Sequence, residues 1–482
     1  MERATGLLVG GAWRRSGQVR PVRDRWSRAL VGEVELARPE DVAAAVGCAA
    51  DLARAWRADP PPPGERAQWL ERAAALLEER RAELMETVVA ETGFTVTDAA
   101  TEVTRAAGTL RISAEEARRI GGEVVPVSAH PGSHDRIAFT QRSPVGVVCA
   151  VSPFNSPLNT VCHKIGPALA AGNAVVLKPS VLTPLSATLL LTVLLEAGVR
   201  PQALGLVVGS GEQVGEQLLR DRRIDMYTFT GSTAAGQRVK SASGLARVHL
   251  ELGANSPTLV LADADLDLVA DLVTQAGYRK AGQVCTSVQR LIVDERVADR
   301  LCELLAPRVR ALAAGDPHLP STRVGPLIHD EAAERVAGWI AEARAQGAGI
   351  LAGGHREGGL VAPTLLDGVT EEMRVAREEV FGPVVGLMRV DSLAAAIRVA
   401  NATAYGLQAG IFTRDVDAAF YAARRLEFGG VMVNDTSSYH ADLMPYGGIK
   451  ASGFGLEGPR YAVQEMTVPR ILVFNLRRPE QA

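Results

Sequence analysis

Hydrophobic residues recur every three or four positions between residues 38 and 119. The segment RPEDVAAAVGCAADLARAWRA carries Asp41 as a cap-like residue near its start. After the breaker DPPPPG, the same spacing continues through ERAQWLERAAALLEERRAELMETVVAETG and stops at Gly93. One apolar face at this spacing is typical of amphipathic helices, and glycine is a common helix stop. The pattern therefore predicts a helical N-terminal region.

The pattern changes to strands that alternate with helices after residue 135. RIAFTQRSPVGVVCAVSPFN alternates and ends in the buried-type run VGVVCAV. Three strand-like runs follow, NAVVLKPS, ALGLVVGSG and DMYTFTGS, and each precedes a helical segment. Short β-rich runs separated by helices favour a parallel sheet wound on both sides. Residues 144–250 are therefore predicted to form a doubly wound nucleotide-binding fold.

A second α/β region is predicted from the same alternation up to about residue 435. SPTLVLADADLDLVADLVTQAG and SVQRLIVDERVADRLCELLAPRVRAL each read as a strand followed by a helix, and GGVMVND ends the series. The tail YAVQEMTVPRILVFNL ends in an apolar, β-rich run with no helix after it. We expect this terminal strand to join another sheet, either of its own chain or of a neighbouring subunit.

Composition narrows the class of protein. Hydrophobic residues make up 47% and charged residues 22% of the 482 positions, as in ordinary globular proteins. A net charge of −3 gives no general attraction to nucleic acid or anionic membranes, and no run of 18 apolar residues predicts a membrane span. The five cysteines form no CxxC pair, which argues against a zinc ribbon or a disulfide framework. We expect a cytoplasmic protein without a metal site.

Two kinds of segment carry candidate chemistry. Cys285 lies in KAGQVCTSVQR, and on composition alone it is a packing residue, a redox thiol or a nucleophile. GSGEQVG, with Gly211 and Gly215, and FTGSTAAG, with Gly231 and Ser232, place glycines at strand–helix turns. Backbone N–H groups at such turns bind phosphates, but neither segment matches the dinucleotide fingerprint GxGxxG. Each turn alone is equally compatible with a simple change of chain direction.

The order of seven segments carries more information than any one of them. SPFNSPLN, GPALAAGNAVVLKPS, FTGSTAAG, LELGANSP, GQVCTS, EEVFGPVV and PYGGIKASGFG closely resemble, in order and spacing, the NAD(P)-dependent aldehyde dehydrogenase superfamily, from about residue 5 to 475. The resemblance implies an α/β protein with a doubly wound Rossmann-type cofactor domain, residues 1–121 and 145–253. It also implies a second α/β catalytic domain, residues 254–460, and a small β oligomerisation arm, residues 122–144 and 461–482.

The same resemblance implies roles for three residues. Cys285 would add to the aldehyde carbonyl, because a thiolate can form a thiohemiacetal and then a thioester. The Asn155 side-chain amide and the Cys285 backbone N–H would stabilise the oxyanion. Glu251 would be the general base for hydrolysis, and its apolar neighbours favour a raised pKa. Without the motifs, Glu251 reads as a surface residue and Asn155 as a turn residue.

Cofactor residues follow from the same motifs. Lys178 matches the family's adenosine-ribose lysine, and Glu379 matches the nicotinamide-ribose carboxylate. Val181 stands where NAD-preferring members commonly carry glutamate, so it makes no bond to the ribose hydroxyls and does not repel a 2′-phosphate. Either NAD or NADP is therefore expected as the cofactor. The full cofactor set is Pro153, Phe154, Lys178, Ser180, Val181, Gly211, Gly215, Gly231, Ser232, Glu379 and Phe381.

The substrate is predicted to be a small polar or anionic aldehyde. His163 stands at a family position lining the aldehyde tunnel, and Tyr439 and His440 belong to the loop that roofs it. Arg111, with Arg105 nearly two turns earlier, is expected at the tunnel entrance. Thr286 completes the predicted substrate set. For each histidine, an ordinary hydrogen-bonded structural role is the alternative.

Short stretches such as HADLMPYGGIKASG most resemble the lactaldehyde, glycolaldehyde and phosphonoacetaldehyde branch. The resemblance also implies a homodimer or homotetramer. Two other functions fit the same fold: a CoA-acylating semialdehyde dehydrogenase, and an inactive structural or binding protein. Glu251 argues against the first, because an arriving thiol needs no base to activate water. The presence of Cys285, Glu251 and Asn155 together argues against the second.

Overall fold

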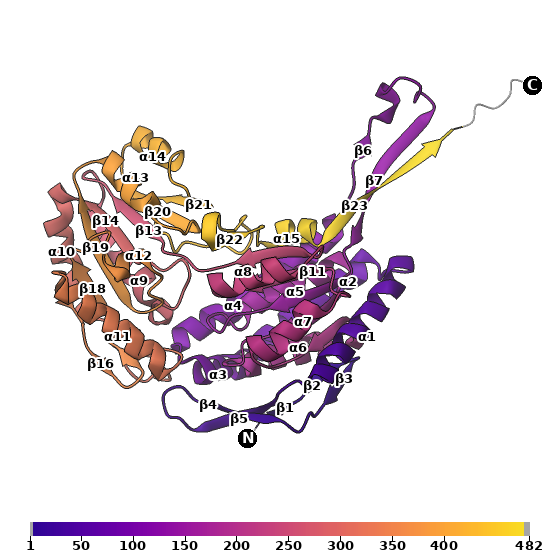
Figure 1. Ribbon diagram of the computed structural model, residues 1–482, viewed down its shortest axis with the longest axis horizontal. Helices are drawn as coiled ribbons and strands as arrows, with labels where there is room; N and C mark the ends of the chain where they lie inside the picture. Colours follow the sequence, from indigo (N-terminus) through magenta and orange to yellow (C-terminus); the bar gives the residue numbers. More distant parts are fainter. Residues whose placement is uncertain (1–2, 477–482) are drawn as a thin grey trace, which may run out of the picture.

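The computed structural model describes residues 3–476, which form two lobes and a projecting arm (Figure 1). One lobe is built on an eight-stranded sheet and the other on a seven-stranded sheet. A three-stranded sheet makes the arm, and another three-stranded sheet lies near the N-terminus. This arrangement agrees with the predicted α/β fold class.

The N-terminal region is helical, as predicted, but divided more finely. Its helices are α1 (Pro39–Ala58), α2 (Pro63–Glu79), α3 (Arg81–Thr92) and α4 (Val96–Arg119). The predicted stop at Gly93 is confirmed, since this residue ends α3 with a φ of 77°. Asp41 is not the N-cap, because it lies inside α1 and accepts a hydrogen bond (3.0 Å) from the backbone N–H of Arg38.

The first sheet has the order β22-β12-β11-β8-β9-β10-β2-β3. Its central strands β8 to β12 are parallel neighbours, whereas β22 and β2 are antiparallel at the flanks. The strands are β2 (Leu7–Val9), β3 (Ala12–Arg14), β8 (Val147–Val151), β9 (Ala174–Lys178), β10 (Leu204–Leu206), β11 (Met226–Thr230), β12 (Arg247–Glu251) and β22 (Gly453–Phe454). The helices that follow its strands are α5 (Asn159–Ala171), α6 (Pro184–Glu196), α7 (Glu216–Arg220) and α8 (Thr233–Ala242).

The second sheet has the order β15-β18-β19-β14-β13-β20-β21, with β15 antiparallel at one edge. Its strands are β13 (Pro257–Val260), β14 (Arg290–Asp294), β15 (Gly349–Ala352), β18 (Thr364–Asp367), β19 (Val384–Val390), β20 (Gln408–Phe412) and β21 (Gly430–Val433). Its helices are α9 (Leu266–Tyr278), α10 (Glu295–Arg310), α11 (Asp330–Ala345), α12 (Arg374–Arg377), α13 (Leu393–Asn401) and α14 (Val416–Ala423). The hairpin β16 (Arg356–Glu357) and β17 (Leu360–Val361) lies beside α11. The predicted domain bounds stay a prediction, and β22, inside residues 254–460, pairs with β12 of the first sheet.

The arm is a three-stranded sheet built from two distant parts of the chain. Its strands are β6 (Val124–Val125), β7 (Arg136–Pro144) and β23 (Thr467–Asn475), and Figure 1 shows it extending away from both lobes. The terminal strand β23 pairs antiparallel with β7 of its own chain along its whole length, and its pairing with a neighbouring subunit stays a prediction. The sheet order β23-β7-β6 places β23 at the edge.

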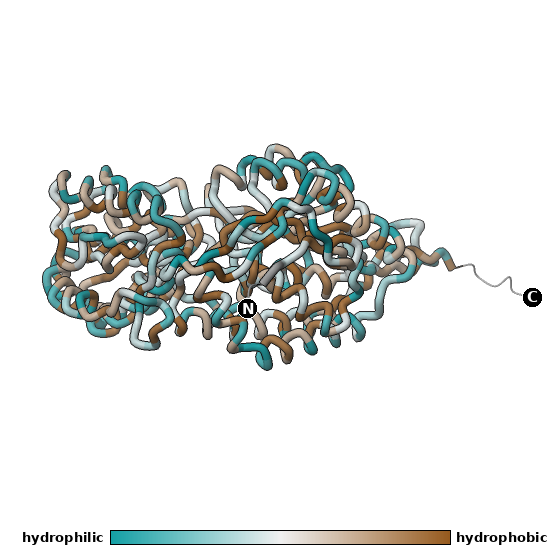
Figure 2. Tube along the Cα trace, turned by 90° about the horizontal axis from the view of Figure 1, so that it is seen from below, coloured by the Kyte–Doolittle hydropathy of each residue, from teal (hydrophilic) through white to brown (hydrophobic). Residues whose placement is uncertain are grey.

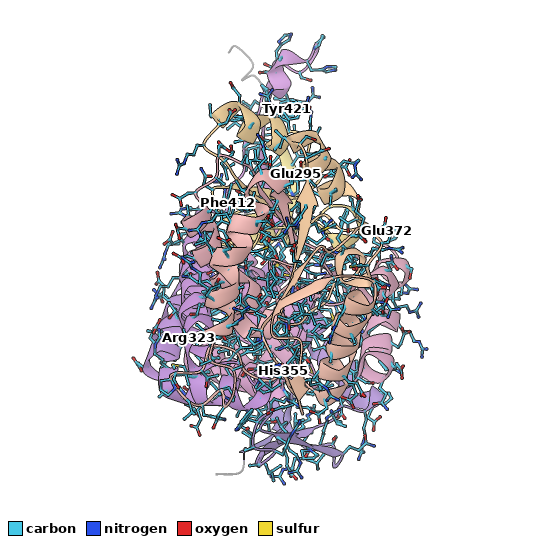
Figure 3. The ribbon with its side chains drawn as sticks, turned by 90° about the vertical axis from the view of Figure 1, so that its left-hand side faces the viewer. Glu295, Arg323, His355, Glu372, Phe412 and Tyr421 are labelled. Atoms are coloured by element: carbon cyan, nitrogen blue, oxygen red, sulfur yellow. The ribbon has the colours of Figure 1, made fainter. Side chains whose placement is uncertain are left out.

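Each large sheet has its own apolar core. Hydrophobic segments run through the interior of both lobes in Figure 2, and polar segments lie mostly outside. Figure 3 looks onto the end of the second lobe, where Phe412 of β20 is buried and Tyr421 of α14 is 44% exposed. The small sheet near the N-terminus contains β1 (Arg3–Thr5), β4 (Val19–Arg23) and β5 (Leu30–Glu35), and α15 (Pro459–Glu465) precedes the arm. Within the described residues, no helix is long and apolar enough to cross a membrane.

Candidate active site

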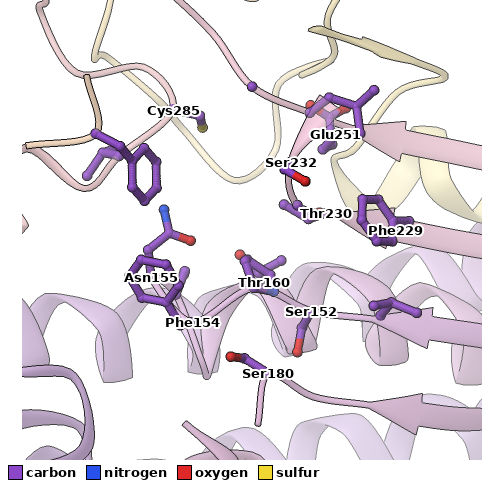
Figure 4. Close-up of a pocket in the computed structure, with 18 of the residues that line it drawn as sticks. Ser152, Phe154, Asn155, Thr160, Ser180, Phe229, Thr230, Ser232, Glu251 and Cys285 are labelled. Atoms are coloured by element: carbon purple, nitrogen blue, oxygen red, sulfur yellow. The ribbon is translucent and has the colours of Figure 1, made fainter. Parts of the chain in front are cut away.

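A cavity of about 590 Å³ brings together most of the predicted site residues (Figure 4). It receives side chains from the ends of β8, β9, β11 and β12 and from loops of the second lobe. Carboxyl ends of parallel strands are the usual location of ligands in such sheets. The predicted residues that line it are Pro153, Phe154, Asn155, His163, Lys178, Ser180, Val181, Gly211, Gly231, Ser232, Glu251, Cys285, Thr286, Glu379, Phe381 and His440.

Cys285 is carried by a loop whose backbone is held under strain. Lys280, Ala281 and Gly282 have φ values of 50°, 53° and 68°, a left-handed conformation that costs energy for residues other than glycine. A side chain at Gly282 would meet the carbonyl oxygen of Gly382 at 2.0 Å, so only glycine fits there. Lys280 Nζ donates to Glu102 Oε2 (2.8 Å) and to the Asn155 carbonyl (2.9 Å). This buried ion pair fixes the cysteine loop against the Asn155 loop.

The Cys285 sulfur has one close polar neighbour. Its Sγ atom lies 3.0 Å from the Tyr446 hydroxyl, and Tyr446 is itself buried. Burial raises the pKa of Cys285 to about 11, while the Tyr446 hydrogen bond opposes that rise. A hydroxyl that donates to sulfur stabilises the thiolate, which is the nucleophilic form.

Asn155 points toward the loop that carries Cys285 (Figure 4). Its Nδ2 atom donates to the Gln283 carbonyl (2.8 Å). A side-chain amide nitrogen has two N–H groups, so one donor remains after this bond. Glu102 holds the Asn155 loop in place, because its Oε1 atom accepts hydrogen bonds from Ser156 Oγ (2.6 Å) and Asn159 N (2.9 Å).

Glu251 ends β12 and is buried at 3% exposure. Its Oε1 atom lies 3.2 Å from His249 Nε2. Its Oε2 atom has no hydrogen-bond partner within residues 3–476. Burial, and then the nearby Glu457 carboxylate, raise the pKa of Glu251 well above its ordinary value. A carboxylate with a raised pKa and one free oxygen suits a general base.

Two charged side chains, Lys178 and Glu379, lie at the end of the cavity that would hold a nucleotide, and both have few polar partners. Lys178 Nζ makes only a long contact (3.5 Å) with the Pro179 carbonyl, and no carboxylate of the described chain pairs with it. Burial lowers its pKa to about 8. Glu379 accepts from Ala254 N (3.0 Å) through one oxygen, and burial raises its pKa to about 7. Ribose hydroxyls or a phosphate would satisfy these groups, so the residues fit NAD or NADP.

The glycine turn after β11 also fits a pyrophosphate. Gly231 follows this strand, and Ser232 caps α8 by accepting a hydrogen bond (3.3 Å) from Ala235 N. Gly231 and Ser232 line the cavity, so the start of α8 lies at its wall. This is the end of the helix dipole that favours anions. Phe154 and Phe381 meet edge to face across the opposite wall, with ring centroids 5.8 Å apart.

A polar cluster closes the other end of the cavity. Asp442 accepts hydrogen bonds from Arg105 (2.6 Å), His163 (2.9 Å) and Asn159 (3.0 Å). Hydrogen bonds from His163 and Arg105 hold the pKa of Asp442 well below its ordinary range, against the effect of burial. Arg105 also contacts His440, and burial together with this charge lowers the pKa of His440 to about 3. His163 is therefore held through Nε2, whereas its buried Nδ1 atom has no hydrogen-bond partner within residues 3–476.

Arg279 lies near this polar cluster but, unlike Arg105, does not form an ion pair with Asp442. Its guanidinium donates from Nε (3.2 Å) and Nη2 (2.9 Å) to the Ser438 hydroxyl. No carboxylate within residues 3–476 lies at ion-pair distance from it. Burial, and then the neighbouring Arg105 charge, lower the pKa of Arg279. Since Arg279 lines the cavity and keeps three unused N–H donors, it offers a binding site for an anion.

Three predicted residues do not line this cavity. Arg111 is exposed and lies outside it, because six positions along α4 place it about 120° around the helix from Arg105. Tyr439 is 51% exposed and also lies outside, since its segment is tied to β20 by a bond (3.2 Å) from Gln408 to its carbonyl. Gly215 lines a neighbouring cavity that shares Lys178, Gly211 and Phe229 with the first.

Sequence reasoning missed three residues of the site. Tyr446 belongs to the quoted segment PYGGIKASGFG, which points to its region but not to its contact with sulfur. Asp442 lies in an irregular loop where no periodic pattern gives orientation. Arg279 stands six residues before Cys285, and its charge at the edge of an otherwise small, polar segment was the available signal.

Comparisons with known proteins agree with this geometry. The sequence model of the Aldehyde dehydrogenase family matches residues 13–472. The chain is 45% identical over 471 residues to 3-sulfolactaldehyde dehydrogenase from Priestia aryabhattai, covering 98% of each chain. Its structure resembles NADP-dependent glyceraldehyde-3-phosphate dehydrogenase from Bacillus halodurans complexed with NADP (TM-score 0.96, 37% identity, 99% and 100% covered). It also resembles aldehyde dehydrogenase 21 from Physcomitrella patens in complex with succinate (TM-score 0.94, 35% identity, 98% and 99% covered).

Proposed function

This chain belongs to the aldehyde dehydrogenase family, and we propose that it oxidises a small aldehyde with an anionic group at its far end. The enzyme uses NAD or NADP and produces the carboxylic acid. One observation carries the choice of substrate: Arg279 lines the cavity without a carboxylate partner among residues 3–476. A sulfonate, phosphonate, phosphate or carboxylate is the chemical class that Arg279 would bind.

Some relatives support this class, whereas others are named lactaldehyde dehydrogenase, after an uncharged aldehyde. The names of two similar proteins contain 3-sulfolactaldehyde and glyceraldehyde-3-phosphate, and a third was solved in complex with its reaction product succinate. All three compounds carry an anionic group. We propose an aldehyde of two to four carbons with one such group, for example 3-sulfolactaldehyde, phosphonoacetaldehyde or succinic semialdehyde. Uncharged lactaldehyde and glycolaldehyde would be weaker substrates because they leave Arg279 without a counter-charge.

Cys285, Asn155 and Glu251 are proposed to carry the reaction. The Cys285 thiolate adds to the carbonyl carbon, and the Asn155 amide stabilises the oxygen that becomes negative. Collapse of this thiohemiacetal expels a hydride and leaves a thioester on Cys285. Bound NAD(P)⁺ supplies the hydride acceptor. Glu251 then removes a proton from water, which attacks the thioester and releases the acid and the thiolate.

The proposed cofactor site uses two charged residues, Lys178 and Glu379, that have no ion-pair partner within residues 3–476. Lys178 and Ser180 would hold the adenosine ribose or its 2′-phosphate, and Glu379 would hold the nicotinamide ribose. Val181 lines the same wall and offers no carboxylate. This composition supports binding of NADP as well as NAD.

We also propose an oligomeric state and a location in the cell. We expect a homodimer or homotetramer assembled through the arm, because β23 is an edge strand that exposes Ile471, Val473 and Phe474. Exposed apolar edge strands commonly pair with another chain. We expect a cytoplasmic location, because all five cysteines are free thiols.

Replacing Arg279 tests the proposed substrate. Arg279→Met should raise KM at least tenfold for succinic semialdehyde and 3-sulfolactaldehyde, and change it less than about twofold for uncharged lactaldehyde. Arg279→Lys keeps the charge without the planar guanidinium fork, so its KM for the charged aldehydes should lie between the values for wild type and Arg279→Met. Arg111→Met is the matched control, because that arginine lies outside the cavity. An equal loss for charged and uncharged aldehydes, or a wild-type preference for hexanal, would contradict the proposal.

A further inference from the structure

His249 makes a buried contact with Glu251 that the reaction described above does not use. Both residues lie on β12, two positions apart, so their side chains project from the same face of the strand. His249 is 1% exposed, and its Nε2 atom lies 3.2 Å from Glu251 Oε1. A buried imidazole is costly unless its ring nitrogens are satisfied, so its partners determine its tautomer.

Thr228 and Glu251 are the two hydrogen-bond partners of His249 within residues 3–476. Lys164 Nζ lies 3.3 Å from Thr228 Oγ1, and a lysine ammonium can only donate. Thr228 therefore accepts from Lys164, and its own hydroxyl hydrogen remains available to donate to His249 Nδ1 at 3.5 Å. A neutral imidazole that accepts at Nδ1 carries its proton on Nε2. An ionised Glu251 can only accept, so in the form that acts as a base His249 donates Nε2–H to Glu251 Oε1.

The charges that face His249 favour its neutral form. Burial, and then the Lys164 ammonium, lower the pKa of His249 to about 4. His163 acts in the same direction from α5, whereas the Glu457 carboxylate opposes it. Glu465 of α15 also lies near His249, because both side chains border the position that a side chain at Gly455 would occupy. Near neutral pH the imidazole is therefore an uncharged donor.

We propose that His249 is a positioning residue for the general base, holding Glu251 through Oε1 so that Oε2 is left for the hydrolytic water. The inference rests on the proposed role of Glu251. The hydrogen bond from His249 also has an electrostatic consequence, because a donor to the ionised carboxylate stabilises that form. The His249 bond therefore opposes the rise in pKa that burial imposes on Glu251, and it keeps more of the base ionised near neutral pH.

The step affected is hydrolysis of the thioester, so the test separates it from hydride transfer. His249→Leu should keep the initial burst of NAD(P)H, at about one per active site. The acid limb of the kcat–pH profile should move to higher pH by about one unit. Steady-state turnover on that limb should then fall about tenfold. His249→Gln keeps an N–H donor and should restore most of the profile.

Thr228 provides a second, milder test that leaves the imidazole in place. Thr228→Val removes the donor that holds the tautomer, so the acid limb should move in the same direction as in His249→Leu, by a smaller amount. Thr228→Ser keeps the hydroxyl and should leave the profile unchanged. If His249→Leu does not fold, the comparison of Thr228→Val with Thr228→Ser decides the question.

An unchanged acid limb in folded His249→Leu, or in Thr228→Val if the leucine variant does not fold, would overturn the inference. The same holds if His249→Gln loses as much turnover as His249→Leu. Glu251→Gln separates this failure from failure of the proposed function. If Glu251→Gln stalls after the burst while His249→Leu keeps its normal profile, only the role of His249 is wrong. If Glu251→Gln turns over normally, the proposed base is wrong.

Discussion

The hydroxyl of Tyr446 lies 3.0 Å from the sulfur of Cys285, in a small apolar cluster that also contains Ala254 and Leu407. Burial in these surroundings raises the pKa of the thiol to about 11. A nucleophilic cysteine needs its thiolate, so a donor at this distance has a direct consequence for reactivity. Tyr446 is therefore expected to do more than fill space.

Replacing Tyr446 should make Cys285 less reactive near neutral pH. Tyr446→Phe removes the donor to the thiolate, so the pKa of Cys285 should rise, and alkylation by iodoacetamide at pH 8 should slow by about three- to tenfold. The measurement is the pH dependence of the alkylation rate, whose inflection should move to higher pH. Tyr439→Phe, at an exposed tyrosine outside the cavity, is the control. An unmoved inflection in Tyr446→Phe would show that its hydroxyl does not stabilise the thiolate.

Replacing Glu251 should separate the two half-reactions. Glu251→Gln keeps the thiolate of Cys285 but removes the base for water, so rapid mixing should show a burst of about one NAD(P)H per active site, followed by a stall. Adding hydroxylamine, which attacks thioesters without a base, should restart turnover. Cys285→Ala is the matched control and should give no burst. A Glu251→Gln protein without a burst would place this residue earlier, in activation of the thiol.

The sequence predicted the fold class because its strands and helices have clear periodicities. The run VGVVCAV became β8, and the helical segments after each strand became α6 and α8. The small arm was harder, since pairing between β7 and β23 joins residues more than 300 positions apart. Nothing in the pattern of β23 alone distinguishes a strand of its own chain from one of a neighbouring subunit.

The site was predictable where motifs fix a residue to the end of an element. Asn155, Glu251 and Cys285 all line one cavity, as their motifs implied. Loops were less predictable, because the direction of a side chain there depends on tertiary contacts. His440 faces the cavity and packs 4.5 Å from the Tyr446 ring, whereas its neighbour Tyr439 faces solvent.

Asp442 should contribute to stability as well as to the shape of the site. It holds Arg105 and His163 together, so Asp442→Asn leaves a partly buried arginine without its counter-charge. We expect the free energy of unfolding at pH 7 to fall by about 3 kcal/mol. Urea denaturation followed by tryptophan fluorescence measures this change. Asp265→Asn, at an exposed surface pair with Arg414, is the control and should change stability by less than about 1 kcal/mol.

The same carboxylate predicts the direction of a pH effect. The pKa of Asp442 is held below its ordinary value in the folded protein, so the folded state binds fewer protons than the unfolded state. Its contribution is therefore complete above the unfolded pKa of about 4 and is lost as pH falls below it. The difference in stability between wild type and Asp442→Asn should shrink between pH 5 and pH 3. A constant difference over that range would mean that Asp442 acts through its shape and not its charge.

Val181 should set part of the balance between the two cofactors. It lines the cavity near Lys178 and Ser180, where a glutamate would accept hydrogen bonds from ribose hydroxyls and repel a 2′-phosphate. Val181→Glu should weaken NADP binding at least tenfold and leave NAD binding equal or stronger, measured as Kd by titration of protein fluorescence. Val181→Gln has a similar size without the charge and should weaken NADP less, since repulsion is removed. Equal Kd ratios in wild type and Val181→Glu would show that other residues determine the preference.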